Sequence, residues 1–518
     1  MTAGRARTVS LHPLAGFAIV GGMYAAFLLL GWLGARRARA SDLILGGRAL
    51  PLWLGALTMT ATWVDGGYLL GTAEGAFRAS PASAWQGGVC FGLSLVLGGL
   101  FFAGRMRARG YTTLIDPFAE RFGQGWAAVL AVPAVLGEVF WSAELLVAVG
   151  ASTSALLGVR LDTAVLVSAA IVVAYTVAGG LWAVAYADVL QLALVAVGMS
   201  LAVPYALDAA GGLAAAWSAY TAAFPDRGGL WPPVTPGGSV WTLPAVSSWW
   251  DVSVMLLLGG IPWNCYFQRV LACETPARAR QTSIAAGLMT IVLVGPPLVL
   301  GVAAAVYPWD AAAQARLAAS PAEALPLLLG AATPAVVALL GLGAIIGAVT
   351  SSFSASVLSA ASMASWNGLR ALARDVTREG VQRALRLAIV LVGAVAALLA
   401  LRAQSVQALW YFTSDLVFVL LFPQLVAALY DPRATRLGSM AAFGVSLVLR
   451  LGGGEPLVGL PPFIPYPELL ARVFPGDPTA WYDASGAMQW PFRILAAAAG
   501  LVVLPVVSRV AGRRVSAR

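Results

Sequence analysis

The chain is 518 residues long, 60% hydrophobic and only 11% charged, with a mean hydropathy of +0.83. A soluble protein of this length would carry about 25% charged residues, so the composition indicates a membrane protein. The single histidine excludes a His-based metal centre and a Ser-His-Asp triad, and the three cysteines, all in or beside apolar segments, argue against a disulfide framework.

Thirteen apolar segments follow one another along the chain, each near the ~20 residues that cross the hydrocarbon core of a bilayer. The segment at 323–365 is long enough to tilt or to contain an irregular piece. We therefore expect an all-α polytopic membrane protein with about 13 transmembrane helices. The segments lie at 14–34, 50–77, 83–104, 124–157, 162–179, 184–207, 248–268, 281–306, 323–365, 384–401, 405–430, 435–452 and 490–508.

The net charge of +9 is explained by membrane topology and does not indicate a nucleic-acid partner. Arginines cluster after the first, third and seventh segments, between the ninth and tenth, and at the end of the chain. By the positive-inside rule this pattern predicts an N-terminus outside and a cytoplasmic C-terminus. The first segment reads as a retained span, because it is long for a signal peptide and lacks a clear cleavage site. All 32 basic residues are arginine, which favours a bacterial inner membrane.

The second segment contains the most informative stretch of the chain. Trp63, Asp65 and the pair Gly66-Gly67 stand in the middle of a predicted span. A helix break there would free backbone carbonyls at membrane depth, which is tolerated only where the backbone lines a cavity. Gly259-Gly260 in the seventh segment, followed by Ile-Pro-Trp, predicts a second break. The pattern indicates a solute-binding site inside the membrane.

Acidic residues within the spans are functional candidates by default, because burying a charge in a bilayer is costly. Few arginines lie near mid-span to pair with them, which favours a cationic cargo or a coupling cation. The alternative is that several sit at span ends or bond to backbone amides and hydroxyls. The candidates are Asp65, Glu74, Glu138, Glu144, Asp188 and Asp415.

Two further groups of residues point to a cation. The ninth segment carries Ser351 and Ser352, whose hydroxyls would suit a monovalent cation opposite the carbonyls of a broken helix, although such residues often bond only to their own helix. Trp63 and Trp263 lie beside the two predicted breaks, Trp141 lies within the long fourth segment, and Trp410 is at the start of the eleventh. A quaternary ammonium has no N–H to donate, so aromatic faces could recognise it; ordinary core packing is the alternative.

At these residues the chain resembles the sodium:solute symporter family, and within it the branch of high-affinity choline transporters. The resemblance runs from about residue 45 to 455. It is carried by Gly-Gly-Arg at 46–48, Thr-Met-Thr-Ala-Thr-Trp at 58–63, Gly-Thr-Ala-Glu at 71–74, Leu-Gly-Gly-Leu-Phe-Phe-Ala at 97–103, Tyr-Thr-Val-Ala-Gly-Gly at 175–180, Gly-Gly-Ile-Pro-Trp at 259–263, Leu-Trp-Tyr at 409–411 and Phe-Pro-Gln-Leu at 422–425.

The resemblance implies a LeuT-type fold in a single domain, 1–518. Two inverted repeats of five helices each would occupy 50–207 and 248–430. The segment 14–34 would be a first extra helix, and 435–508 would hold the final two helices. The two predicted breaks then lie near the start of each repeat.

The resemblance also implies two binding sites. A sodium ion would be held by the carbonyls of Ala61, Val64 and Ala348 and the hydroxyls of Ser351 and Ser352, with Asp188 as a nearby accessory acid. Choline would lie in an aromatic cage of Trp63, Trp141, Trp263 and Trp410, with Phe91 where the animal proteins have Tyr. That branch is chloride-dependent, but no chloride site can be placed in this sequence.

The chain departs from the animal choline transporters at three positions. Asp65 replaces a Gly, Glu144 replaces a small residue, and Ser354 replaces an acid in the ninth span. The hypothesis that follows is that an acid near the cation sites has moved from the ninth span to the second.

We expect a secondary transporter and not an enzyme, importing choline or a related quaternary amine with sodium by alternating access. One alternative is a sodium symporter for a betaine, a primary amine or an amino acid; the carboxylate of Asp65 favours an amine with N–H groups. Another is a membrane protein that senses a solute without moving it, although no output domain follows the last span. The oligomeric state is left open.

Overall fold

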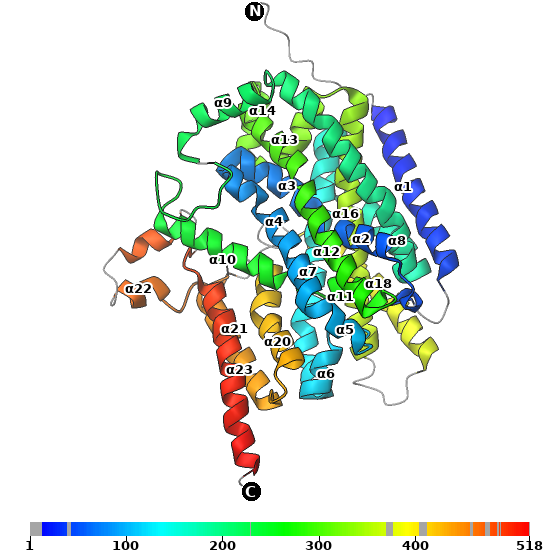
Figure 1. The fold of residues 1–518 in the computed structure, drawn as a ribbon. Helices are drawn as coiled ribbons and strands as arrows, with labels where there is room; N and C mark the ends of the chain where they lie inside the picture. The colour runs from blue at the N-terminus through cyan, green and yellow to red at the C-terminus, as the bar shows by residue number, and fades with distance from the viewer. Residues whose placement is uncertain are drawn as a thin grey trace, which may run out of the picture.

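A computed structural model describes residues 13–38, 43–227, 229–368, 377–402, 412–455, 459–471, 477–483, 486 and 488–516. In these ranges the regular elements are helices, and extended pairing is limited to isolated bridges such as Leu50 with Cys273. Helix α1 (Pro13–Arg37) begins at one end of the helical bundle, and α23 (Phe492–Ser516) ends at the opposite end (Figure 1).

The helices follow the order of the predicted segments. In the first half they are α1 (Pro13–Arg37), α2 (Leu52–Trp63), α3 (Gly66–Glu74), α4 (Pro81–Leu97), α5 (Gly104–Ala108), α6 (Asp116–Phe122), α7 (Gln124–Leu157), α8 (Leu161–Ala209) and α9 (Leu213–Ala223). In the second half they are α10 (Leu243–Gly259), α11 (Asn264–Ala272), α12 (Pro276–Leu293), α13 (Gly295–Val306), α14 (Ala311–Ala319), α15 (Ala324–Ala332), α16 (Ala335–Met363), α18 (Arg378–Ala400), α20 (Phe422–Tyr430), α21 (Arg436–Gly452), α22 (Tyr466–Ala471) and α23 (Phe492–Ser516).

Short helical turns of other pitch join or extend several of these helices. The 3-10 turns are η1 (Gly46–Arg48), η4 (Pro225–Arg227), η5 (Pro321–Glu323) and η9 (Pro478–Trp481). The π-helical turns are η2 (Gly75–Ala79), η3 (Gly98–Ala103), η6 (Ala364–Gly368) and η7 (Val417–Leu421).

Ten helical stretches in the described residues are long and apolar enough to cross a bilayer. One of them is α8, whose 49 residues cover both predicted segments 162–179 and 184–207. The predicted segment 50–77 is divided between α2 and α3, and 435–452 corresponds to α21, which has 17 residues. A total of thirteen spans therefore stays a prediction.

The long predicted segment 323–365 contains the irregular piece that its length indicated. It is divided at Thr333 and Pro334 into α15 and α16. Proline cannot donate a backbone hydrogen bond and disfavours helix in the residue before it, which explains the break.

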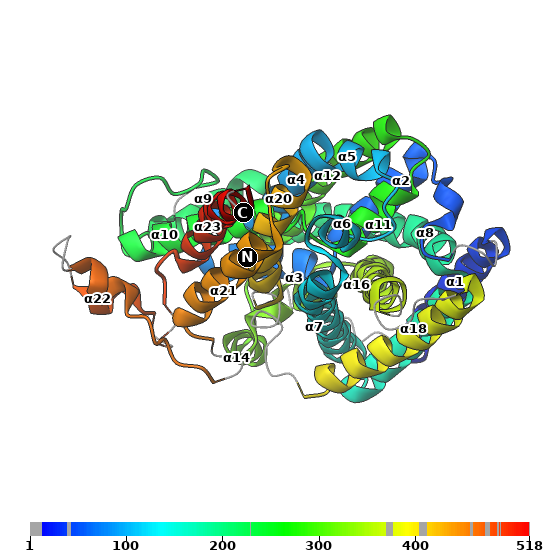
Figure 2. The same ribbon diagram turned by 90° about the horizontal axis from the view of Figure 1, so that it is seen from below.

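The helix α16 lies at the centre of the bundle, where Figure 2 shows it enclosed by its neighbours. It packs against α7 and α8 and also contacts α2, α3 and α11. Almost every side chain from Val337 to Met363 is buried, including a run of serines and threonines. The hydroxyls of such a buried helix can contribute to a site only where they face polar groups of a neighbouring helix.

Two predicted spans are broken in the middle, as the sequence indicated. One break separates α2 from α3 and the other separates α10 from α11, across 260–263. At the second break the neighbouring chain approaches closely: a Cβ added to Gly259 would come within 2.6 Å of Phe418 Cβ. Both breaks lie inside the bundle, where protein and not lipid surrounds the free backbone groups.

Charged residues at one end of the bundle form a buried network. Arg493 in α23 pairs with Asp251 in α10 at 3.0 Å and with Asp415 at 2.7 Å. Arg450 in α21 pairs with Asp415 and Glu455 at 2.6 and 2.5 Å. Asp415, a candidate from the sequence, is therefore part of an ion-pair network that joins α10 to α21 and α23.

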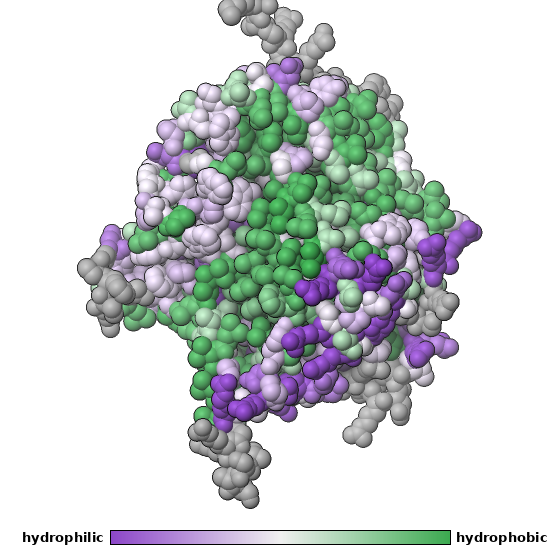
Figure 3. All heavy atoms as spheres, viewed as in Figure 1, coloured by the Kyte–Doolittle hydropathy of each residue, from purple (hydrophilic) through white to green (hydrophobic). Residues whose placement is uncertain are grey.

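The outer surface has the pattern expected of a membrane protein. Hydrophobic residues cover the middle of the face shown in Figure 3, and hydrophilic residues gather towards the lower end, where Figure 1 shows α5 and α6. The helix α5 carries Arg105 and Arg107. Arginine at one end of an apolar bundle fits the positive-inside pattern.

The kink in α8 depends on one glycine. Gly180 has φ 53° and ψ −137°, a conformation that a residue with a side chain rarely adopts. A Cβ there would lie 2.3 Å from the carbonyl oxygen of Leu43, which also accepts a hydrogen bond from Leu181 N–H at 3.0 Å. The backbone of residue 43 thus packs directly onto the kink.

Gly180→Ala should destabilise the folded protein by about 1–3 kcal/mol, because strain and a backbone clash act together. The melting temperature of the purified protein in detergent measures this. Gly22→Ala in α1 is the matched control, since a Cβ at Gly22 meets nothing within 4 Å. Equal melting temperatures for the two variants would contradict the role of Gly180.

Candidate functional site

The break between α2 and α3 falls at Val64 and Asp65, just before the glycine pair. The last turn of α2 ends with Val64 N–H bonded to Thr60 O at 2.9 Å. Asp65 is extended, with φ −94° and ψ −173°, and α3 begins at Gly66. The carbonyls in the last turn of α2 therefore have no intrahelical donor and are available to other partners.

Gly66 and Gly67 lie in the first turn of α3, after the break, and their role is to allow close packing. A Cβ on Gly66 would lie 2.5 Å from Val349 Cγ2 in α16 and 3.2 Å from Ala148 Cβ in α7. A side chain at this position would push both helices away from the break. The glycine is needed because three elements meet there.

Asp65 holds the break in place. It is 5% exposed, and its Oδ1 accepts a hydrogen bond from Tyr68 N–H at 2.6 Å, which caps the first turn of α3. Its Oδ2 accepts a hydrogen bond from the indole N–H of Trp141 at 2.8 Å. One carboxylate thus fixes both the start of a half-helix and the orientation of an aromatic ring.

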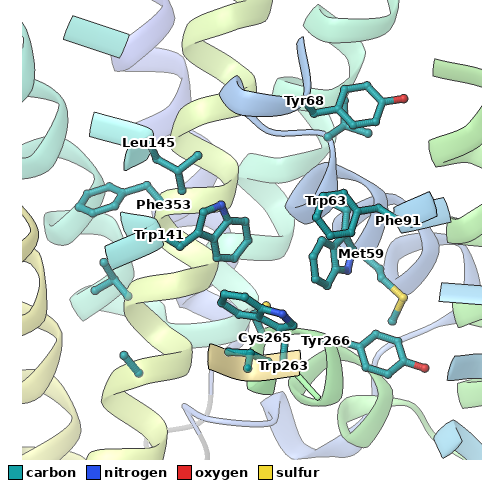
Figure 4. Close-up of a cluster of buried hydrophobic side chains, with 14 of the residues drawn as sticks. Met59, Trp63, Tyr68, Phe91, Trp141, Leu145, Trp263, Cys265, Tyr266 and Phe353 are labelled. Carbon is teal, nitrogen blue, oxygen red and sulfur yellow. The ribbon is translucent and has the colours of Figure 1, made fainter. Parts of the chain in front are cut away.

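Four aromatic rings meet beside this carboxylate (Figure 4). The ring centroid of Trp63 lies 5.9 Å from that of Trp141, 6.3 Å from that of Trp263 and 5.0 Å from that of Phe91. Trp141 and Trp263 are 5.4 Å apart at an interplanar angle of 68°. The rings come from α2, α7, α4 and the residue that precedes α11, so both broken spans contribute.

This aromatic cluster of Trp63, Phe91, Trp141 and Trp263 has the chemistry of a cation site. All four residues are less than 9% exposed. Because the three indole centroids lie so close together, a cation beside the rings would be within the ~6 Å range of cation–π attraction to more than one face. Trp410, the fourth predicted tryptophan, lies outside the described residues.

A second group of oxygen atoms lies where α16 crosses the end of α2. Ser352 donates to Thr62 O at 2.8 Å and lies 3.4 Å from Ala61 O. Ala348 is one helical turn earlier on α16, and Val64 forms the break itself. The structure therefore brings two of the predicted sodium ligands, Ala61 and Ser352, together where α2 meets α16.

Asp188 in α8 completes this polar contact. It accepts from Ser351 at 2.7 Å and from Thr58, which lies on α2. Arg269 in α11 is fully buried and its Nη2 is 3.9 Å from Asp188. Thr58 and Arg269 were not among the predicted site residues, although Thr58 lies in a string that carries the family resemblance. Their contacts with Asp188 join residues more than 80 positions apart in the sequence.

The remaining acids of the spans have different surroundings. Glu74 makes an ion pair with Arg78 at 3.4 Å. Glu138 in α7 accepts from Cys265 N–H at the start of α11 and from the hydroxyls of Ser356 and Ser359. Both thus have the ordinary partners that were the alternative to a functional role.

Glu144 lies one and a half turns after Glu138 on α7 and has no such partners. It is fully buried, and neither carboxylate oxygen has a hydrogen-bond partner in the described part of the chain. Its Oε1 would be 2.6 Å from a Cβ on Gly67, so the carboxylate lies against the N-terminus of α3.

Ser354, the position of the third departure, faces elsewhere. It donates to Ser351 O at 2.8 Å on its own helix and also bonds to Tyr175 in α8. Asp65 instead contacts Trp141 on α7. The hypothesis that one acid replaces the other stays a prediction, and Ser354 and Asp65 have different hydrogen-bond partners.

Removing the carboxylate of Asp65 tests its structural part. Asp65→Ala leaves Tyr68 N–H and the Trp141 indole N–H without their acceptor, which should lower stability by about 1–3 kcal/mol. Asp65→Asn keeps acceptor oxygen and should lie between Ala and the unmodified protein. Melting temperature and tryptophan fluorescence in detergent report both effects.

Asp310→Ala is the control for this experiment, because Asp310 caps the exposed helix α14 in the same way, accepting from Ala313 N–H at 2.7 Å. It should change the melting temperature less and leave the fluorescence unchanged. If Asp65→Ala is as stable as this control, Asp65 does not hold the break between α2 and α3.

Comparison with known proteins gives consistent results. The family model for the sodium:solute symporter family matches residues 43–445. The chain is 37% identical to "High-affinity choline transporter 1" of Caenorhabditis elegans, covering 96% of this chain and 85% of that protein. It is 35% identical to "High affinity choline transporter 1" of Homo sapiens, covering 89% and 78%.

The fold has a counterpart among solved structures. A substrate-bound, outward-open Na+-coupled sialic acid symporter is 17% identical, covers 96% of this chain and 97% of its own, and superposes with a TM-score of 0.75. This likeness confirms the expected LeuT-type helical fold. The boundaries of the two repeats stay a prediction.

The family model matches most of the chain, and the relatives and the solved fold agree with it. These comparisons fit the two broken spans and the aromatic and acidic side chains that lie beside the breaks. The chain belongs to the sodium:solute symporter family, a family of multi-pass membrane transporters and not of enzymes.

Proposed function

We propose that this protein imports choline or a closely related quaternary amine together with sodium. The observation that carries the proposal is the aromatic cluster of Trp63, Phe91, Trp141 and Trp263 at the two helix breaks. Two relatives of high identity are named high-affinity choline transporters, which supports the same cargo.

The chemistry of the cluster suits a quaternary ammonium. Such a group has no N–H, so it is recognised by aromatic faces and by a nearby negative charge, with cation–π attraction of about 2 kcal/mol when desolvated. Asp65 supplies that charge and bonds to the ring of Trp141. Because the rings contact one another, cargo enters only when they separate, so binding is linked to movement of the half-helices.

Sodium would bind where α2 meets α16. Carbonyl oxygens of Ala61, Val64 and Ala348 and the hydroxyls of Ser351 and Ser352 are the proposed ligands, with Asp188 as the accessory acid. The contacts of Ser352 with Thr62 O and Ala61 O support this assignment. Neutral oxygens suit a monovalent ion, and the described residues contain no cluster of three or more His, Cys, Asp or Glu that would hold a divalent metal.

Sodium at this contact would couple to the cargo through one short helix. Its ligands in α2 directly precede Asp65, and Trp63 in the same turn belongs to the aromatic cluster. An ion that ties α2 to α16 would therefore set the position of Trp63. One charge crossing 100 mV supplies about 2.3 kcal/mol, enough for roughly 50-fold accumulation of the cargo.

We place the N-terminus outside and the C-terminus in the cytoplasm of a bacterial inner membrane. The start of α1 and the end of α23 at opposite ends of the bundle, together with the arginines of α5, support the orientation. Chloride is a further candidate ion from the resemblance alone. A lipid bilayer, sodium and a small organic cation are the partners this proposal requires, and nucleic acid is not among them.

The structure favours the quaternary amine over an amine with N–H groups. Both oxygens of Asp65 already accept hydrogen bonds, from Tyr68 and Trp141. An N–H cargo would have to reach the remaining lone pairs of these two oxygens, whereas a methylated ammonium needs only the aromatic faces and the charge. Betaine, primary amines and amino acids remain the competitors to compare, and a sensor would bind without accumulating.

Uptake of radiolabelled choline into proteoliposomes tests the proposal. An inward sodium gradient should drive accumulation in the unmodified protein, and Trp63→Ala should reduce uptake at least 10-fold because it removes the ring that contacts the other three. Trp53→Ala, on the same helix but 60% exposed, is the control and should retain uptake. Uptake of choline that does not respond to sodium, or that survives Trp63→Ala, would contradict it.

The sodium site is tested with Ser352→Ala. Loss of one ligand should raise the sodium concentration for half-maximal uptake by about 10-fold, equal to about 1.4 kcal/mol. Ser365→Ala is the control, because that hydroxyl bonds to Ala361 O at 2.7 Å on its own helix. If both variants show the same sodium dependence as the unmodified protein, Ser352 is not a ligand.

A further inference from the structure

Glu144 differs from every other buried acid in the core of the bundle. Asp65, Glu138, Asp188, Asp251 and Asp415 each have a hydrogen-bond donor or an arginine partner. Glu144 is fully buried, and both of its carboxylate oxygens lack a hydrogen-bond partner in the described residues. A buried carboxylate without a donor is expensive, so something must compensate for its charge.

The carboxylate of Glu144 lies beside that of Asp65. The position that a Cβ on Gly67 would occupy is 2.6 Å from Glu144 Oε1 and 3.4 Å from Asp65 Oδ1. Both carboxylates therefore face the first turn of α3 within a few ångströms of each other. In the described residues no arginine makes a hydrogen bond or ion pair with either acid.

The two acids are not equivalent. Asp65 is stabilised as an anion by Tyr68 N–H, by the indole N–H of Trp141 and by the positive end of the α3 helix dipole. Glu144 has none of these hydrogen bonds. The geometry thus leaves the carboxyl group of Glu144 without a partner, beside a position that Asp65 also faces.

We propose that Asp65 and Glu144 form a second sodium site at the N-terminus of α3, separate from the contact between α2 and α16. This inference rests on the proposed sodium-coupled transport and adds a second ion to it. A monovalent ion fits because a calcium ion takes six to eight oxygen ligands, usually from several carboxylates, and no third acid joins this pair in the described chain.

The second site would be coupled to the cargo through a shared carboxylate. Asp65 contacts the proposed ion on one side and holds the Trp141 ring with its Oδ2 on the other. An ion between the two acids would remove their mutual repulsion and fix Asp65, and with it the ring. Occupation of the site should therefore favour the arrangement of Trp141 that completes the aromatic cluster.

Counting bound sodium on the purified full-length protein tests the inference without any organic cargo. Equilibrium binding of radioactive sodium should give two ions per chain for the unmodified protein and one for Glu144→Gln. Ser352→Ala should still bind two ions at saturating sodium, one of them about 10-fold more weakly, and the double variant should keep only this weakened ion. Glu138→Gln is the matched control, a buried glutamate of the same helix that has its own donors, and it should bind two.

Several results would overturn the proposal. The proposal is wrong if Glu144→Gln binds two ions. It is also wrong if the unmodified protein and Glu144→Gln each bind one ion, which would mean that Glu144 carries a proton instead. The single ion that Glu144→Gln retains shows that this variant is folded. Glu144→Asp should restore the second ion with weaker affinity, which a merely structural role would not predict.

Flux measurements separate this inference from the proposed function. With choline as cargo, the ratio of sodium to choline transported should fall from two to one in Glu144→Gln. If choline is not transported but the binding counts change as expected, the cargo is wrong and the second site stands. If choline uptake is sodium-driven and the counts do not change, the second site is wrong and the proposed function stands.

Discussion

A broken helix in a membrane must find partners for its backbone groups inside the protein, because lipid offers none. The rest of the site depends on how this chain meets that requirement at Val64 and Asp65. The side chain of Asp65 satisfies the first turn of α3, and a hydroxyl of α16 meets the carbonyls at the end of α2. Each of these substitute partners is itself a group that can recognise a cation.

The helix α7 serves both broken spans at once. Glu138 accepts from Cys265 N–H at the start of α11, Trp141 donates to Asp65 at the start of α3, and Glu144 lies against the same first turn. Carboxylates therefore lie at the N-terminal, positive ends of both α3 and α11, where the helix dipole stabilises them. A movement of either half-helix changes contacts on one shared helix, which links the two halves of the molecule.

The arrangement explains how an ion and an organic cation can be close without strong repulsion. In the proposed mechanism the aromatic cluster attracts a cation through its ring faces, while Asp65 and Asp188 supply negative charge nearby. In a low-dielectric interior these charges act over short distances with little screening. The buried arginine nearest the sodium-ligand contact, Arg269, is directed to Asp188 and not to the aromatic cluster.

The sequence by itself determined the class of protein, the order of the apolar segments, both broken spans and the residue types of a cation site, because hydropathy, glycine and proline act locally. Tertiary structure decided which candidates work together. Glu138 and Asp415 proved to have partners on other helices, Cys265 and Arg493, at 127 and 78 residues along the chain. Asp65 and Glu144, noted separately as departures, proved to be neighbours. Thr58 and Arg269 gained roles only when α2, α8 and α11 came together at Asp188. The partner of a buried charge is set by how helices pack, and a single sequence does not contain those long-range distances.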